Sequence, residues 1–225
     1  MQHSRRTLIK GASIITMDAL GDLPQGDILV TGDSLTEISP AIHADDAQVI
    51  DGAGFIVIPG LVNAHKHTWQ TALRGLAANW TLLEYFQKMH AGLATVFEPQ
   101  DLYIATLFGS LNQLNGGTTT LADWCHNNPT PAHNDAAITA RPSPTRNRAR
   151  RRSGRCRIRA TDLNMQPVID PVNSVVMQTS LANIDSVMVA GKWKKRHGQL
   201  LGVELAPHLE ALRASSRKII AAMAL

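Results

Sequence analysis

Hydrophobic residues in the first sixty positions fall into short runs with strand character, separated by turns that contain glycine. The runs are 7–17, 27–31, 34–38, 49–51 and 55–58. Gly32-Asp33 lies between the second and third runs and favours a two-residue hairpin turn, and Gly52-Ala53-Gly54 separates the last two. Several short strands at this spacing predict a small β-sandwich.

Beyond position 60 the pattern changes from strands alone to strands alternating with helices. The compact apolar run 61–64 predicts a buried parallel strand. A helix is expected after Thr81, because Glu84 stands at the spacing of a capping box. A second helical pattern runs from 98 to the glycine pair at 116–117, and 118–123 predicts another strand. This order is typical of a β/α repeat with parallel strands.

The β/α pattern does not resume after residue 138. Residues 139–157 have no hydrophobic period and very few core residues, which is typical of a segment without a packed core. Closer to the C-terminus, 184–189 and 192–195 flank Ala190-Gly191 and predict a hairpin. An amphipathic helix is expected from 206 to 224.

The positive charge of the chain is concentrated in one segment. The net charge is +4, yet nine of the 22 lysines and arginines lie between 141 and 159, where there is no acidic residue. The remaining 13 basic residues face 18 acidic ones, so the rest of the chain is mildly acidic. Clustered arginines can neutralise nucleic-acid phosphates, but no aromatic residues for base stacking are interleaved with them. A nucleic-acid-binding insert at 141–159 is therefore kept only as an alternative.

Composition and cysteine usage indicate where the chain resides. No apolar run approaches the roughly eighteen residues of a membrane span, so no membrane insertion is expected. The two cysteines are far apart and form no C-x-x-C spacing, which favours a reducing cytoplasm. Residues 4–10 look like a twin-arginine export signal. The apolar stretch after them is short and ends at Asp18 without a cleavage site, so a first strand is preferred.

The sharpest chemical feature is a pair of histidines that directly follows the apolar run 61–64. On a strand, His65 and His67 share a face and Lys66 points the other way. Two imidazoles at the C-terminal end of a barrel strand can ligate one divalent metal ion. By spacing alone, His-x-His is more typical of two solvated or hydrogen-bonded histidines. Its position after a buried strand that itself follows a sandwich segment favours the metal site.

Residues 55–67 resemble the first barrel strand of the amidohydrolase superfamily, and 116–123 resemble its second. The nearest branch holds cytosine and guanine deaminases, adenosylhomocysteine deaminases and triazine chlorohydrolases, and 170–172 and 183–192 resemble its C-terminal segment. The resemblance implies an α/β fold, an incomplete (β/α)8 barrel of the TIM type that carries a composite β-sandwich. The implied parts are the sandwich at 1–58 and 162–202, two β/α units at 59–138, an Arg-rich non-family segment at 139–157 and a C-terminal helix at 203–225.

The same resemblance implies a metal-dependent hydrolase with His65 and His67 as its first two ligands. Imidazole suits zinc and iron, and zinc is expected before iron. In the family, activated water attacks a carbon of a small heteroaromatic substrate and releases ammonia or chloride. Two later histidines and an aspartate complete the metal site there, and a glutamate commonly shuttles protons. Nothing here corresponds to them, so no catalytic residue is identifiable and an inactive fragment is expected, with its oligomeric state open.

Three further residues are candidates for the site. By resemblance, Trp69 and Gln70 would line the substrate pocket, with simple packing as the alternative for Trp69. Asp123 could orient a ligand histidine as a hydrogen-bond acceptor, with a helix or turn cap as the alternative. No role is assigned to the histidines that match no family motif: His126, His133, His197 and His208.

The segment 139–157 is bounded on both sides by sequence that resembles the family, although it has no period and no acidic residue itself. We hypothesise that a deletion or frameshift joined the N-terminal third of such a protein to its C-terminal tail. Finding no barrel-like sequence in the other reading frames of these codons would count against a frameshift.

Overall fold

The computed structural model describes residues 5–140 and 154–222, so most of the Arg-rich segment and both chain ends lie outside the described residues. The chain divides into two compact units, each discontinuous in sequence. As far as they are described, the first comprises Met1–Val62, Gln113–Thr120 and Arg146–Gly202. The second comprises Asn63–Asn112, Leu121–Thr145 and Val203–Leu225.

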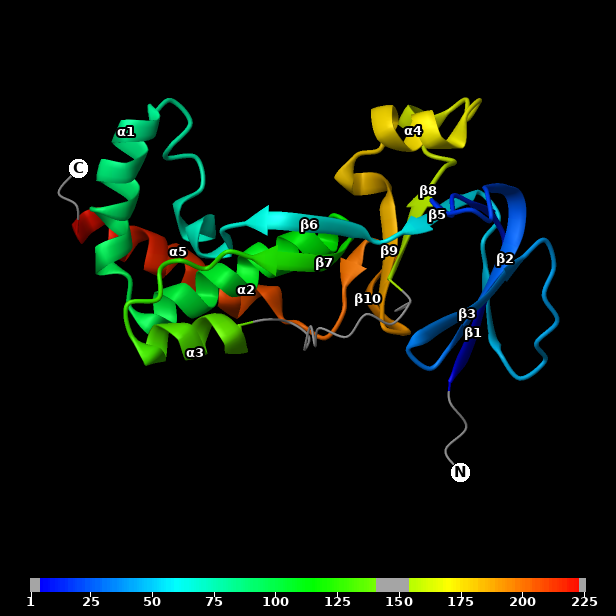
Figure 1. The fold of residues 1–225 in the computed structure, drawn as a ribbon, viewed down its shortest axis with the longest axis horizontal. Coiled ribbons are helices and arrows are strands. Elements are labelled where there is room, and N and C mark those ends of the chain that lie inside the picture. Colours follow the sequence, from blue (N-terminus) through cyan, green and yellow to red (C-terminus); the bar gives the residue numbers. More distant parts are fainter. Residues whose placement is uncertain (1–4, 141–153, 223–225) are drawn as a thin grey trace. The chain divides into compact units, whose positions relative to one another are not determined.

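The first unit is built on one mixed sheet, which has nine strands within the described ranges (Figure 1). Its elements are β1 (Arg6–Ile14), β2 (Leu23–Thr31), β3 (Ser34–Ser39), β4 (Gln48–Asp51), β5 (Phe55–Pro59), β8 (Arg155–Arg159), α4 (Pro171–Gln178), β9 (Ile184–Val189), β10 (Lys192–Arg196) and β11 (Gln199–Leu200). Strand β1 is antiparallel to β2 and parallel to β4 and β5. Strand β8 lies between β5 and β9 and is antiparallel to both. Strands from the two ends of the sequence therefore share one sheet.

Both faces of this sheet are covered by buried side chains. On β5, Ile56 and Ile58 belong to one apolar cluster, whereas Val57 belongs to another that also holds Ile28 and Met188. Successive side chains of a strand point to opposite faces, so the two clusters lie on opposite faces. Full burial of each such side chain stabilises the fold by about 1.5–3 kcal/mol.

The two predicted hairpins are confirmed. Thr31 pairs with Ser34, which leaves Gly32-Asp33 as a two-residue turn between β2 and β3. Gly32 has a φ of +61°, which turns of this length require and glycine adopts without strain. Val189 pairs with Lys192 in the same way between β9 and β10.

Strand β8 corrects the prediction for the C-terminal end of the Arg-rich segment. The sequence pattern predicts no structure for 139–157, but the last three of these residues begin β8. Cys156 is buried, and the guanidinium of Arg157 stacks 3.5 Å from the centre of the Phe55 ring. Arg159 donates to the carboxylate of Asp185 at 2.7 Å. Cation–π stacking and ion pairing thus allow arginines to alternate with apolar residues in a strand.

Helices make up most of the second unit. They are the 3₁₀ helix η1 (Thr68–Leu73), α1 (Leu82–Glu84), the π-helix η2 (Tyr85–His90), the 3₁₀ helix η3 (Leu93–Val96), α2 (Pro99–Asn115, whose last residues belong to the first unit), α3 (Pro131–Thr139) and α5 (Leu205–Ala222). The predicted capping box of α1 is confirmed, since Thr81 and Glu84 bond each other's backbone N–H groups. No helix in the described part of the chain is long and apolar enough to cross a membrane.

Strands β6 (Leu61–Lys66) and β7 (Thr118–Asp123) form a separate two-stranded sheet (Figure 1). The N–H of Leu61 donates to the carbonyl of Gly117, and the N–H of Trp124 donates to that of Lys66. From the first hydrogen bond to the second, the residue number rises on both strands. The pairing is therefore parallel, as predicted.

The prediction that β6 is buried is wrong. Leu61 is 45% exposed and Val62 is 69% exposed. A parallel strand is buried when neighbouring strands and crossover helices cover it. Among the described strands only β7 pairs with β6, so its apolar side chains remain in contact with solvent.

Helix α5 is fastened to the N-terminal end of α2 by polar contacts. The hydroxyl of Ser215 donates to the buried carboxylate of Asp101 at 2.7 Å. The ammonium of Lys218 donates to Glu98 at 2.9 Å and also pairs with Asp101. Burial opposes the charge of Lys218, but these carboxylates raise its pKa overall. The last helix is therefore an integral part of the second unit.

Candidate metal and substrate site

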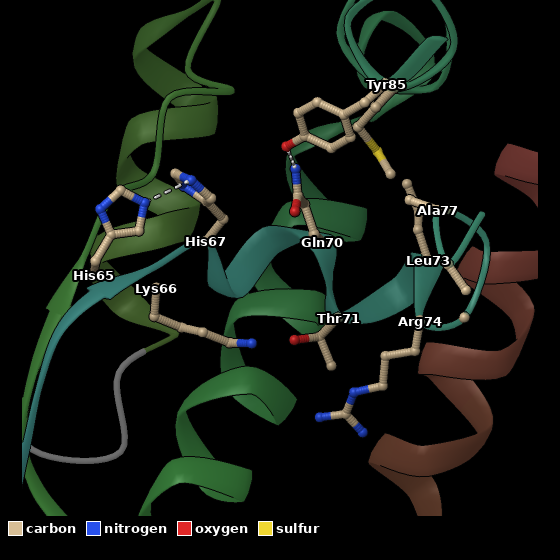
Figure 2. A pocket seen from close by; sticks show the side chains of 12 residues that line it. His65, Lys66, His67, Gln70, Thr71, Leu73, Arg74, Ala77 and Tyr85 are labelled. Carbon is tan, nitrogen blue, oxygen red and sulfur yellow. Dashed lines mark hydrogen bonds between the residues drawn. The ribbon is translucent and has the colours of Figure 1, made fainter. Parts of the chain in front are cut away.

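His65 and His67 lie at the C-terminal end of β6, where their rings meet edge-on at an interplanar angle of 80°. Their Nε2 atoms are 3.2 Å apart, and Lys66 points away from the two rings (Figure 2). The Nδ1 of His67 lies 2.8 Å from the carbonyl oxygen of Trp124. A carbonyl can only accept, so Nδ1 carries the proton and Nε2 keeps its lone pair. Metal-ligating histidines are oriented by such a carbonyl in many proteins.

The spacing of the two nitrogens fits a shared metal ion. A tetrahedral zinc ion with Zn–N bonds of about 2.0–2.1 Å holds its ligand nitrogens about 3.3–3.4 Å apart. The 3.2 Å separation of the two Nε2 atoms is close to this value. Within the described residues, no group of three or more His, Cys, Asp or Glu side chains is arranged to hold a metal ion. The pair therefore supplies two ligands, and the described chain does not complete the set.

Asp123 fixes the backbone directly after the histidine pair. Its carboxylate accepts the N–H of Thr68 at 3.1 Å and the hydroxyl of Thr68 at 2.7 Å. The acceptor for the ring of His67 is the carbonyl of Trp124, one residue beyond Asp123. Asp123 thus acts on the turn that follows His67, and its neighbour in sequence contacts the ring.

Trp69 and Gln70 occupy different environments. The side chain of Trp69 is fully buried and packs edge-on against Phe97, with ring centres 5.2 Å apart. Gln70 lines a pocket, and its amide donates to the hydroxyl of Tyr85 (Figure 2). Of the two candidates, only Gln70 faces the pocket.

The pocket beside the histidine pair has a volume of about 470 Å³, which suits a small ring-shaped molecule. It is lined by His65, Lys66, His67, Gln70, Thr71, Leu73, Arg74, Gly75, Ala77, Ala78, Tyr85 and Met89. None of these lining residues, all of them in the described second unit, is a carboxylate that could move protons. Glu84 on α1 is engaged in the capping box. Its hydrogen bonds with the N–H of Thr81 and the ammonium of Lys88 lower its pKa to about 2.

Two further histidines, His90 and His126, lie beside the pair, and neither was predicted to belong to the site. The ring of His126 lies 4.4 Å from that of His67, measured between centres, and its Nε2 is 3.4 Å from the Nε2 of His90. The Nδ1 of His126 faces the carbonyl of Trp124 at 3.0 Å. Burial and the nearby His126 and His67 lower the pKa of His90.

A positional signal could have identified His126. It follows β7 by three residues, and the C-terminal ends of parallel strands are where functional side chains gather. No comparable signal exists for His90, which ends the π-helical turn η2. Of the other unassigned histidines in this unit, His133 is buried, and its two ring nitrogens contact Thr130 and the carbonyl of Phe97.

Residues 56–211 match the amidohydrolase family, and the chain belongs to this family. It is 34% identical over 117 residues to a 5'-deoxyadenosine deaminase of Methanosarcina mazei, covering 52% of this chain and 27% of that protein. It is 36% identical over 123 residues to a 5-methylthioadenosine/S-adenosylhomocysteine deaminase of Acetivibrio thermocellus, covering 52% and 28%. The chain thus spans about a quarter of the length of these curated relatives.

The chain is also similar to solved structures. An atrazine chlorohydrolase from Arthrobacter aurescens, solved with zinc, has a TM-score of 0.53 and 26% identity over 60% of this chain and 32% of its own. An adenosine deaminase from Xanthomonas campestris, solved with bound zinc, has a TM-score of 0.78 over 96% of this chain and 98% of its own. At 12% identity, the second similarity speaks for the fold alone.

Proposed function

We propose that this chain carries the metal-binding strand of a hydrolase acting on a carbon–nitrogen or carbon–chlorine bond of a heteroaromatic ring. The observation that carries the proposal is the placement of His65 and His67. Their Nε2 atoms are 3.2 Å apart, and the ring of His67 is held by the Trp124 carbonyl. Family membership supports a hydrolase, and relatives named for adenosine derivatives and atrazine support a small heteroaromatic substrate.

His65 and His67 would hold a divalent ion, with zinc expected before iron. Such an ion would supply Lewis-acid activation of a water at neutral pH. Residues of this chain would orient the metal ligand His67 and contact the substrate. The Trp124 carbonyl sets the tautomer of His67, Asp123 fixes the turn after it, and Gln70 presents a polar amide from the pocket wall to a ring substrate.

We propose that the chain represents an incomplete barrel and is inactive by itself. The barrel part would span 59–138, with the composite β-sandwich at 1–58 and 162–202 and the C-terminal helix at 203–225. Three observations on the described residues support this. Strand β6 has a single partner strand, its apolar residues are exposed, and no carboxylate lines the pocket. Exposed strand edges and apolar faces also predict a tendency to aggregate.

A chimera separates competence of the site from completeness of the chain. Residues 56–123 would replace the matching region of the Methanosarcina mazei deaminase, which supplies the rest of a barrel. The folded chimera should retain zinc and release ammonia from 5'-deoxyadenosine. His65→Asn and His67→Asn should each abolish both properties. In the intact chain, His208→Asn serves as a control for folding at a partly exposed histidine outside residues 56–123. A folded chimera that neither retains zinc nor turns over substrate would refute the proposed role of the pair.

A further inference from the structure

His90 and His126 form a second pair of imidazoles in the second unit, next to the pair on β6. The Nε2 atoms of His90 and His126 are 3.4 Å apart, the separation expected for two ligands of one tetrahedral metal ion, about 3.3–3.4 Å. The corresponding distance between His65 and His67 is 3.2 Å. The second pair therefore meets the same distance criterion as the first.

The ring of His126 is oriented in the same way as that of His67. Both Nδ1 atoms face the carbonyl oxygen of Trp124, at 3.0 Å for His126 and 2.8 Å for His67. This oxygen can only accept, so both Nδ1 atoms carry the proton and both Nε2 atoms present a lone pair. One backbone carbonyl thus prepares a histidine of each pair for metal binding.

His90 is held in place by the local backbone and by aromatic neighbours. It ends η2, where the N–H of Ala91 donates to the carbonyl of Phe86 five residues earlier, the spacing of a π-helix. Such turns are rare and occur frequently at functional sites. The ring of His90 lies 5.0 Å from that of Tyr85 and 6.1 Å from that of Trp69, measured between centres. These contacts direct its Nε2 toward His126.

We propose that His90 and His126 form a second binding site for a divalent transition metal ion, separate from the His65–His67 pair. Imidazole nitrogen selects zinc, cobalt, nickel or copper over magnesium or calcium, which prefer oxygen. His126 is exposed and His90 is partly exposed, so water can fill the remaining coordination positions. With two protein ligands, the site would bind its metal reversibly. This inference goes beyond the proposed hydrolase function and does not depend on it.

The test is a zinc titration of the untagged full chain, followed by the ring ¹⁵N resonances of its histidines. Zinc should shift the Nε2 resonances of His90 and His126 together, independently of those of His65 and His67, and calorimetry should count two equivalents. Magnesium should shift none of them. His126→Asn keeps an N–H for the Trp124 carbonyl but removes Nε2, and His90→Gln removes the other ligand. Each variant should lose one equivalent, whereas His208→Asn should lose none.

Several outcomes would overturn the second site. Resonances of His90 and His126 that zinc leaves in place would show that the two rings form only a direct hydrogen bond. A single equivalent that involves all four histidines would show one shared site.

If His65→Asn or His67→Asn loses one equivalent while the His90 and His126 shifts persist, the two sites are independent, as proposed. Loss of binding at His65 and His67 alone would count against the proposed function and leave the second site standing.

Discussion

The sheet of the first unit and the β6–β7 pair differ in how completely each buries its apolar side chains. In the sheet, Ile28 and Val57 are fully buried and belong to one apolar cluster on a covered face of the sheet. In the pair, Val62 is 69% exposed although it lies in an apolar run at the start of its strand. Strands β2 and β5, which carry these residues, each have two partner strands, whereas β6 has only β7 among the described strands. Apolar sequence therefore predicts a strand, but the number of neighbours decides whether that strand is buried.

The largest expected effect is in the covered sheet. Ile28→Ala should lower the free energy of unfolding by about 3 kcal/mol, because it removes buried methyl groups and leaves a cavity in the cluster that Ile28 shares with Val57 and Met188. Urea denaturation followed by far-ultraviolet circular dichroism would measure this. A loss below about 1 kcal/mol would show that the sheet is loosely packed, and the contrast with β6 would disappear.

The next largest effect concerns the ion pair that allows arginine within the sheet. Asp185 is buried and accepts from Arg159 at 2.7 Å and from Ser186. Asp185→Asn should cost about 2 kcal/mol at neutral pH, a modest value because Arg159 is partly exposed. Urea denaturation at pH 7 would measure the difference.

The same contact predicts how stability depends on pH. Burial raises the pKa of Asp185, but the hydrogen bonds from Ser186 and Arg159 outweigh it and lower the pKa below 3.8. A lowered folded-state pKa gives stability that is present above the ordinary pKa and is lost as pH falls through the folded value. Wild type should therefore lose more stability than Asp185→Asn when the pH falls below about 4. Parallel acid profiles of the two proteins would contradict this.

In the site region, a smaller effect is expected from the contact that fixes the turn after His67. In Asp123→Asn, the amide NH₂ cannot accept from Thr68, so one of two hydrogen bonds is lost. Zinc affinity at His65–His67 should fall about tenfold, as for other groups that orient metal ligands. Affinity at His90–His126 should stay unchanged, which the ring ¹⁵N titration distinguishes. Equal weakening at both pairs would indicate general unfolding of the unit.

The smallest effect is expected on β6. Val62→Ala should change the free energy of unfolding by less than about 0.5 kcal/mol, because the side chain already contacts solvent. The matched comparison is Ile28→Ala under the same urea conditions. A cost similar to that of Ile28→Ala would show that β6 is covered in solution, by a further segment or a second molecule.

Local patterns predicted the elements that local chemistry determines. The hairpin at Gly32-Asp33 and the capping box of Thr81 and Glu84 depend on residues within a few positions of each other. The helices α3 and α4 also have a local signal that hydrophobic periodicity does not reveal, a capping Thr130 or Asp170 followed directly by proline. Strand β8 was missed because its arginines are stabilised by Phe55 and Asp185, which are distant in sequence.

The candidate site was predictable only where neighbours in sequence are neighbours in space. The i, i+2 spacing places His65 and His67 on one face, and the structure brings their Nε2 atoms together. His90 and His126 are separated by 36 residues and meet through a π-helical turn and the end of β7. Trp69 is closer in sequence to the pair than Gln70, yet packing of the second unit buries it. Pairwise tertiary contacts of this kind leave no periodic trace in a single sequence.

The central claim, that this chain begins a metal site without completing it, is tested most directly by the metal content of the purified chain. After exhaustive dialysis and alongside an ammonia-release assay with 5'-deoxyadenosine, the account predicts well under one equivalent of zinc plus iron and no ammonia release. Structural zinc sites use four protein ligands and catalytic ones three. A pair of histidines supplies only two, so its metal should dissociate during dialysis. A full equivalent of retained metal together with ammonia release would contradict the claim.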